Sequence, residues 1–426
     1  MQRITLFFGI LAMVALSLAA TNADEVFGET PAAVPISSIE NKGAQQAFLK
    51  HQELQQRLRD SLKHYFDGAI ANGTIVGVGV SVVKGDSILF AGGFGKRNVK
   101  TENRVNGETV FRLGSLSKGF GGVLATSLEK NGQLSLQDAI VDHVPNFQFG
   151  NDRHTRSVQL RHVLSHTSGT PYHSYTNLVE AGLSPSDIAP RFVEVDPISG
   201  PGEQYSYQNA MFAMGQELME RATGTSVKEL LSQGFFEPLG MAQVSMDHKP
   251  LLQGKNVALP HRKRGRTWQQ LPLTDKYYNA VLAGGINASA LDMAKWMRFL
   301  LGHNPDVLGQ EDLEKAFDPI IELNQNGKYY QRWPGHQKSA YALGWRVHHF
   351  QEENGLELER VLHHGGSVNS YRNEIALYPE TNLGICVLFN SPTKLASTVI
   401  PEVHRLVKEV YADADAPAKD LASLNP

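Results

Sequence analysis

The chain has 426 residues, of which 41% are hydrophobic and 19% are charged, a profile typical of a globular protein. Its length suits one large domain or two interleaved domains with a sizeable core. Its formal net charge is −3, which gives no reason to expect nucleic acid or an anionic membrane surface as a partner.

Residues 1–23 are predicted to be a signal peptide. Arg3 supplies a positive charge, Ile4 to Leu18 is apolar, and the residues up to Ala23 are small. We expect cleavage after Ala23 and export to a bacterial periplasm or the medium, with no transmembrane segment in the mature chain. The alternative is an anchor retained at the N-terminus.

The N-terminal part of the mature chain predicts a helix followed by a β-hairpin. Apolar residues recur at helical spacing over 45–70. Residues 76–83 and 87–90 are rich in β-branched and apolar residues, with a Lys-Gly-Asp turn between them. A further helix is expected to begin near Ser115.

Strand signals return near the C-terminus, whereas residues 131–279 predict mainly helix and loop. The expected strands lie at 343–350, 360–363, 374–378 and 384–389, before a closing helix over 397–411. The pattern predicts an α/β (α+β) fold, in which both termini form an antiparallel sheet flanked by helices and an all-helical subdomain is inserted. The predicted parts are an α/β part at about 45–130 and 280–411, a helical part at 131–279, and a flexible tail at 412–426.

Two smaller features have mainly structural interpretations. Cys386 is the only cysteine, so an internal disulfide is excluded, and its apolar neighbours predict a buried strand position. The basic run His261–Arg266 is interpreted as a solvated loop.

The first candidate motif is S-x-x-K, formed by Ser115 and Lys118. Residues three apart share a helix face, so the lysine amine can meet the serine hydroxyl and activate it as a nucleophile. A lysine can act as a base only if its pKa is lowered, which burial and the positive end of the helix dipole both favour. Alone, the motif is a weak signal, because a capping serine and a surface lysine often occur at this spacing.

Two more motifs follow along the chain. Tyr207 and Asn209 form Y-x-N, in which the tyrosine can relay protons if a cation lowers its pKa, and the asparagine can hold a substrate amide and the lysine amine. His364, Gly366 and Ser367 lie in a His-His-Gly-Gly-Ser stretch, where the glycines allow a backbone to approach a ligand closely. Alone, each also fits a packed tyrosine or an ordinary loop.

Together, in this order, the motifs S-x-x-K, Y-x-N and H-x-G resemble those of the serine β-lactamase and penicillin-binding protein superfamily, in its class C branch. The resemblance covers roughly residues 45–411. It includes the Leu-Ser-His-Thr-Ser-Gly segment at 164–169 and the Ala-Gly-Gly segment at 283–285, followed by Asp-Met-Ala at 292–294.

The resemblance implies a serine hydrolase that forms an acyl-enzyme at Ser115, with Lys118 and Tyr207 as the proton-transfer pair. It implies that Asn209 orients the substrate amide, and that His364 faces a substrate carboxylate or assists proton transfer. The backbone N–H groups of Ser115 and Ser367 would form the oxyanion site, with Gly366 between His364 and Ser367. His166 is expected to have a structural hydrogen-bonding role.

The third motif departs from the K-T-G of many class C β-lactamases, because His364 and Gly365 replace its lysine and threonine. A neutral histidine binds a carboxylate less well than a lysine, so a lysine at position 364 is predicted to favour anionic substrates. The expected substrate is a β-lactam or a D-Ala-type peptide. The alternatives are an esterase or amidase on small esters or D-amino-acid peptides, and a slow-turnover penicillin-binding sensor. No metal or organic cofactor is expected.

Overall fold

The computed structural model describes residues 36–324, 327–351 and 358–415. The predicted signal peptide therefore lies outside the described residues. The chain divides into two units, residues 1–51 and 52–426. Residues of helix α1 (Ile36–Ala71) belong to both units.

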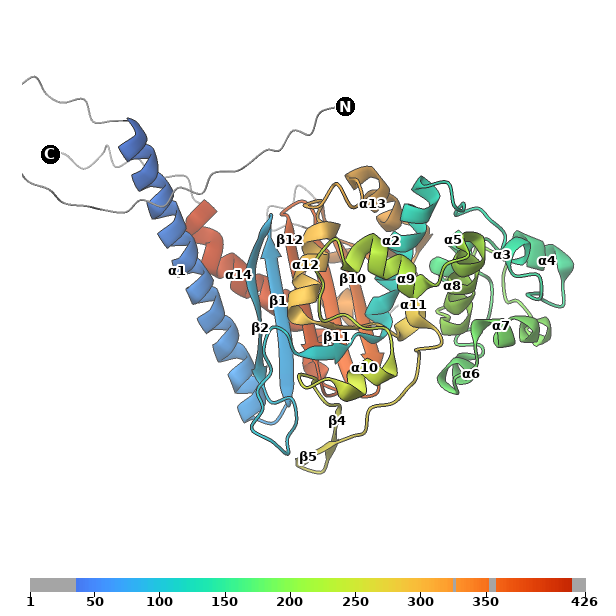
Figure 1. The fold of residues 1–426 in the computed structure, drawn as a ribbon, viewed down its shortest axis with the longest axis horizontal. Helices are drawn as coiled ribbons and strands as arrows, with labels where there is room; N and C mark the ends of the chain where they lie inside the picture. Colours follow the sequence, from blue (N-terminus) through green and yellow to red (C-terminus); the bar gives the residue numbers. More distant parts are fainter. Residues whose placement is uncertain (1–35, 325–326, 352–357, 416–426) are drawn as a thin grey trace, which may run out of the picture. The chain divides into compact units, whose positions relative to one another are not determined.

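The second unit is built on one antiparallel sheet of eight strands, in the order β2-β1-β12-β11-β10-β9-β8-β7 (Figure 1). The N-terminal hairpin pairs directly with the last strand, since Val78 lies opposite Phe389. The predicted antiparallel sheet with flanking helices is confirmed. The strands are β1 (Gly77–Lys84), β2 (Ser87–Gly95), β7 (Ile321–Glu322), β8 (His336–Tyr341), β9 (Arg346–Gln351), β10 (Leu358–Val368), β11 (Tyr371–Tyr378) and β12 (Leu383–Phe389).

Helices cover both faces of this sheet and bury its alternating apolar residues. One core contains Leu58, Leu62 and Phe66 of α1, as the helical spacing predicted, together with residues of α14 (Val399–Asp415). Residues 412–415, placed in the predicted tail, belong to this last helix. The other core includes residues of α2 (Ser117–Lys130) and α12 (Ala290–Leu300).

The middle of the chain is mostly helical, as the weak strand signal predicted. The same core that packs α2 continues into this region through residues such as Phe212, so the helices and the sheet share one apolar interior. The helices here are α3 (Ile140–His143), α4 (Asp152–Ser157), α5 (Leu160–Leu164), α6 (Thr176–Glu180), α7 (Pro185–Ile188), α8 (Asn209–Thr223), α9 (Val227–Leu231), α10 (His248–Gln253), α11 (Val281–Gly284) and, beyond it, α13 (Gln310–Phe317).

The basic run is a hairpin rather than a loop, and it interrupts the region predicted as all-helical. Strands β4 (His261–Arg264) and β5 (Thr267–Gln270) pair around a turn in which Gly265 has φ +60°. The interpretation as a loop was wrong because charge dominated the pattern, although Lys263 lies opposite Trp268 at a normal cross-strand position.

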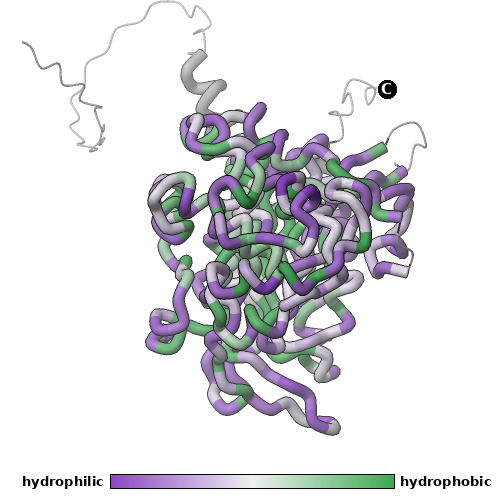
Figure 2. Tube along the Cα trace, turned by 90° about the vertical axis from the view of Figure 1, so that its right-hand side faces the viewer, coloured by the Kyte–Doolittle hydropathy of each residue, from purple (hydrophilic) through white to green (hydrophobic). Residues whose placement is uncertain are grey.

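Cys386 is fully buried in β12, which confirms its predicted position. In the tube coloured by hydropathy, hydrophobic segments gather in the interior (Figure 2). Among the described helices, none combines the length and the apolar character needed to cross a bilayer.

Candidate active site

Ser115 lies in a tight turn between a short strand and a helix. Strand β3 (Val110–Arg112) leads into the 3₁₀ turn η1 (Gly114–Leu116), and α2 follows directly. The helix predicted near Ser115 therefore begins at Ser117, after this turn. Gly114 has φ +58°, and a Cβ added there would lie 2.9 Å from the backbone of Ser367. The turn carrying Ser115 thus lies close against the backbone of β10.

Lys118, in the first turn of α2, is fully buried. Its amine donates to Asn209 Oδ1 at 2.8 Å and to the carbonyl oxygen of Ala283 at 2.7 Å. Burial, with the positive charge of Arg346 as a smaller cause, holds the pKa of Lys118 well below its usual value near 10.5. The neutral amine required of a base is therefore favoured.

Tyr207 contacts Ser115 directly. Its hydroxyl donates to Ser115 Oγ at 2.8 Å, while Lys118 Nζ lies 4.8 Å from the centre of its ring. Burial raises the pKa of Tyr207 to about 12, although the hydrogen bond with Ser115 and the charge of Arg346 both lower it. The sequence suggested a lowered pKa. Desolvation outweighs the cations here, so Tyr207 is a neutral phenol that can donate a proton.

The segment carrying Tyr207 is held by His166. The His166 carbonyl oxygen accepts from Ser206 N at 2.8 Å, and its Nδ1 accepts from Gln208 N at 3.2 Å. His166 is buried and adopts φ +59°, a conformation uncommon outside glycine. Its predicted hydrogen-bonding role is therefore observed. Asn209 follows as the first residue of α8, with its amide directed to Lys118.

The third motif lies on β10, where successive residues face opposite sides of the sheet. A Cβ on Gly366 would lie 2.2 Å from the carbonyl oxygen of Leu113, so the strand can meet the turn carrying Ser115 only with glycine at this position. A Cβ on Gly365 would instead approach the hydroxyl of Tyr329, at 2.8 Å. Ser367, which is exposed, continues the strand beside Gly114.

His364 is buried and held on both ring nitrogens. Nδ1 donates to the carbonyl oxygen of Gly365 at 2.8 Å, so Nε2 accepts from the hydroxyl of Tyr341 at 3.0 Å. Burial is the main cause that holds the pKa of His364 well below 6.5, with further lowering by Arg346 and Lys118. The ring is therefore neutral and supplies no positive charge to a substrate carboxylate.

The cation that sequence reasoning missed is Arg346, at the start of β9. Its guanidinium lies 5.5 Å from the ring centre of Tyr330 and 5.8 Å from that of Tyr341, and it acts electrostatically on both Lys118 and His364. Within the described ranges, it makes no ion pair with a carboxylate. In the sequence, the signal that could have identified Arg346 is an arginine between the buried residues of a predicted strand.

A second buried polar cluster lies on the side of β10 that His363 faces. His363 Nδ1 is 3.1 Å from His348 Nε2, and His363 Nε2 is 2.8 Å from Glu374 Oε2. Tyr329 donates to the same oxygen at 2.8 Å, and Arg372 lies 2.5 Å from the other one. Burial raises the pKa of Glu374 to about 7, against the lowering influence of Arg372. The cluster ties β9, β10 and β11 together.

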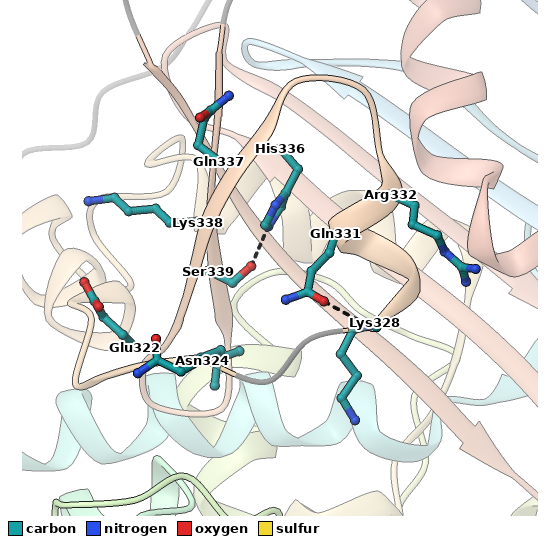
Figure 3. A pocket seen from close by; sticks show the side chains of 11 residues that line it. Glu322, Asn324, Lys328, Gln331, Arg332, His336, Gln337, Lys338 and Ser339 are labelled. Carbon is teal, nitrogen blue, oxygen red and sulfur yellow. Dashed lines mark hydrogen bonds between the residues drawn. The ribbon is translucent and has the colours of Figure 1, made fainter.

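A pocket of about 510 Å³ lies beside strand β8 (Figure 3). It is lined by residues around β8, among them Lys328, Gln331 and His336, and the ring of His336 is 2.7 Å from Ser339 Oγ. None of Ser115, Lys118 and Tyr207 lines it. Among the residues that the structure describes, no group of three or more His, Cys, Asp or Glu side chains is arranged to hold a metal ion.

The fold thus brings the first two sequence motifs into direct contact and places the third against the turn that carries Ser115. Lys118 and Asn209 are hydrogen-bonded, as are Tyr207 and Ser115. Such a group of residues can activate a serine for attack on a carbonyl and supply a proton to a leaving group.

Comparisons with known proteins find relatives that match most of this chain. A protein named flp from Staphylococcus aureus (strain NCTC 8325 / PS 47) is 24% identical over 357 residues, which are 82% of this chain and 65% of that protein. The unguisins hydrolase ungD of Aspergillus violaceofuscus is 23% identical over 74% of this chain and 58% of its own length. The chain therefore spans less than two thirds of the length of these curated relatives.

Two solved structures share the fold. One is an octameric penicillin-binding protein homologue from Pyrococcus abyssi, with a TM-score of 0.67 and 22% identity, covering 83% of this chain and 80% of that one. The other is EstCE1, a hydrolase with promiscuous acyltransferase activity, with a TM-score of 0.68 and 18% identity, covering 83% of this chain and 99% of that one. The family model described as Beta-lactamase matches residues 62–406, and the chain therefore belongs to this family.

Proposed function

We propose that this protein is a serine hydrolase that forms an acyl-enzyme at Ser115. The observation that carries the proposal is the 2.8 Å hydrogen bond between Tyr207 and Ser115 Oγ, beside a buried lysine whose amine is held by two acceptors. A serine hydroxyl is a weak nucleophile at its own pKa and needs a base, a role that a neutral Lys118 amine can take, while Tyr207 can supply a proton to the leaving group.

In the proposed reaction, Ser115 Oγ bonds to the substrate carbonyl carbon and its proton passes to the neutral amine of Lys118. The backbone N–H groups of Ser115 and Ser367 stabilise the oxyanion. The bond to the leaving group then breaks, Tyr207 protonates that group, and Lys118 returns a proton to Tyr207. Water attacks the resulting ester with the same pair accepting its proton, and Ser115 regains its hydrogen.

For the substrate, we propose a β-lactam or a D-Ala-type peptide, as in class C β-lactamases and related peptidases. Both carry a free carboxylate, and Arg346 is a cation near the site that pairs with no carboxylate among the described residues. Arg346 can then supply the charge that the neutral His364 does not. Asn209 would orient the substrate amide.

A neutral ester or amide is the second candidate substrate, favoured by the neutral histidine in place of a lysine at position 364. A third candidate function is that of a penicillin sensor, which would form the acyl-enzyme but hydrolyse it slowly. A panel of nitrocefin, a D-Ala-D-Ala peptide and p-nitrophenyl esters separates the three. Arg346→Gln also removes a charge that lowers the pKa of Lys118, so some loss is expected on every substrate, but kcat/KM should fall about tenfold more for the anionic substrates than for p-nitrophenyl acetate. An equal loss on both would argue against the carboxylate role.

The nucleophile is tested with Ser115→Ala. Wild-type protein should label with a fluorescent penicillin or a fluorophosphonate at a stoichiometry near one, and the variant should not label although its circular dichroism is unchanged. Labelling of the alanine variant to the same extent would refute the assignment.

A further inference from the structure

A chain of hydrogen bonds leads from the catalytic lysine to a partly exposed carboxylate. Lys118 donates to Asn209 Oδ1 at 2.8 Å, and Asn209 Nδ2 donates to the hydroxyl of Tyr277 at 3.1 Å. That hydroxyl donates in turn to Glu180 Oε1 at 3.1 Å, and the other oxygen of Glu180 lies 2.5 Å from Lys276 Nζ. Each hydrogen bond in the chain therefore has a defined donor and a defined acceptor.

The position of Tyr277 is fixed by burial, by its backbone conformation and by close packing. It is 8% exposed and adopts φ +72°, a left-handed conformation that is costly for a residue with a large side chain. A Cβ on Gly285 would lie 2.4 Å from its carbonyl oxygen, so the two glycines after Ala283 let it pack closely. The neighbouring Asn279 donates to the carbonyl oxygens of Val179 and Leu183, which attaches this segment to α6.

The direction of the chain determines which way the amide of Asn209 points. Because Glu180 is an acceptor only, the Tyr277 hydrogen is directed to it, and the lone pairs of that hydroxyl receive the Asn209 NH₂ group. The amide oxygen of Asn209 is then turned toward Lys118. With the Asn209 amide reversed, its NH₂ group would face the Lys118 amine, and that amine would lose one of its hydrogen-bond acceptors.

The orientation matters because a neutral amine has two N–H bonds and one lone pair. Asn209 Oδ1 and the carbonyl oxygen of Ala283 occupy both N–H groups of Lys118. The lone pair then remains for the proton that leaves Ser115. An amine free to rotate would present its lone pair only part of the time.

We infer that Tyr277 and Glu180 are positioning residues, which act through the Asn209 amide to orient the Lys118 amine toward the Ser115 proton. This inference rests on the proposed function, in which Lys118 is the base. Neither residue touches the substrate in this role, so both act through Asn209 on the rate of acylation.

The test compares Tyr277→Phe with Tyr278→Phe as a matched control. Tyr278 is the adjacent tyrosine, and its hydroxyl donates to Asn287 Oδ1 at 2.9 Å, outside this chain. Tyr277→Phe should lower the acylation rate about tenfold, the effect of one lost hydrogen bond. Its pH–rate profile should also shift, since loss of a fixed acceptor disfavours the charged lysine and moves the acid limb to lower pH. Tyr278→Phe should do neither.

Two variants at Glu180 add a second, independent measurement at a partly exposed position. Glu180→Gln keeps an acceptor oxygen for Tyr277 and should retain most of the rate, whereas Glu180→Ala should resemble Tyr277→Phe. A wild-type acid limb in Tyr277→Phe, or equal losses in both tyrosine variants, would overturn the inference. If wild-type protein fails to label at Ser115, the proposed function itself fails. That outcome differs from the two outcomes that would overturn only the role of Tyr277 and Glu180.

Discussion

At the scale of single residues, the site depends on which groups burial keeps neutral. Lys118 and His364 are buried and Tyr207 is half-buried, and in each case desolvation is the main cause of the shifted pKa. Burial disfavours the charged form of every group, so it lowers the pKa of the amine and of the imidazole and raises that of the phenol. Burial therefore favours a neutral amine at Lys118 next to a phenol at Tyr207 that keeps its proton.

This pairing predicts that Lys118→Arg is inactive. An arginine keeps the positive charge and the N–H donors but cannot lose its proton in a protein, so it cannot serve as a base. We expect the acylation rate to fall on the order of 10²–10⁴-fold, the usual contribution of general base catalysis. Stopped-flow labelling with a fluorescent penicillin measures it. An active arginine variant would contradict the role of the lysine.

The neutral state of Lys118 also sets the direction of the pH dependence. The amine is protonated below its pKa, so the acylation rate should fall as the pH decreases through that value. Because the pKa is depressed from about 10.5, the rate should already be substantial below pH 10.5.

A lysine introduced at position 364 would be buried beside Lys118 and Arg346. We therefore expect its positive charge to lower the pKa of Lys118 and make it a weaker base, rather than to improve carboxylate binding.

Glu374 predicts a pH dependence of stability. Its pKa is about 7 in the folded protein and near 4.5 when exposed, so the folded state binds more protons between these values. The contribution to stability is therefore complete below about pH 4.5 and is lost as the pH rises through 7, by up to about 3 kcal/mol. Urea unfolding at pH 5 and pH 8 should show this loss in wild-type protein and much less of it in Glu374→Gln. The exposed Glu237→Gln variant serves as the control and should behave like wild type.

At the scale of elements, the site depends on how closely β10 approaches the turn η1. Gly366→Ala would place a methyl group 2.2 Å from the carbonyl oxygen of Leu113, so the strand must move away from the turn. The backbone of Ser367 moves with it, and loss of one oxyanion donor typically costs roughly 10²–10³ in rate. Acylation kinetics of the purified variant measure this loss.

Gly384→Ala is the control for this prediction. In β12, an added Cβ would meet side-chain atoms of Val83 and Met297, the nearest at 2.8 Å, rather than backbone. It should lower the melting temperature and leave the acylation rate of the folded protein nearly unchanged. If both variants lose stability and activity in the same proportion, the close approach of β10 has no specific role.

The order of elements could be predicted from the sequence because periodicity and β-branched runs are local signals. Leu58, Leu62 and Phe66 marked the buried face of α1, and the run around Cys386 marked a central strand. The hairpin β4–β5 could not be predicted in this way, since its strands are short and mostly exposed. Their pairing depends on contacts that a charge pattern does not encode.

The same distinction applies to the site. Ser115, Lys118, Tyr207 and Asn209 could be found because motif spacing carries them. Tyr277, Glu180 and Arg346 reach the site from segments without a motif, and only the folded chain places them there. The sign of the Tyr207 pKa shift was also beyond the sequence, because desolvation depends on the atoms packed around the phenol.

At the scale of the whole molecule, the predicted signal peptide still needs a direct test. We expect the mature chain to begin at Asp24 and to be recovered from the periplasm or the medium. N-terminal sequencing and fractionation of producing bacterial cells measure this. A mature protein that retains residues 1–23 would instead support the N-terminal anchor.

The pairing of β1 with β12 has a consequence for how the chain acquires its structure. Gly77 N donates to Asn390 Oδ1 across a separation of 313 residues, and the two strands lie side by side within the sheet rather than at its edge. The sheet therefore cannot close during synthesis until the residues of β12 have left the ribosome. Contacts this distant in sequence make folding slow. A chain that stays unfolded for so long exposes unpaired strand edges to aggregation. It also stays in the unfolded state that translocation of an unfolded polypeptide requires.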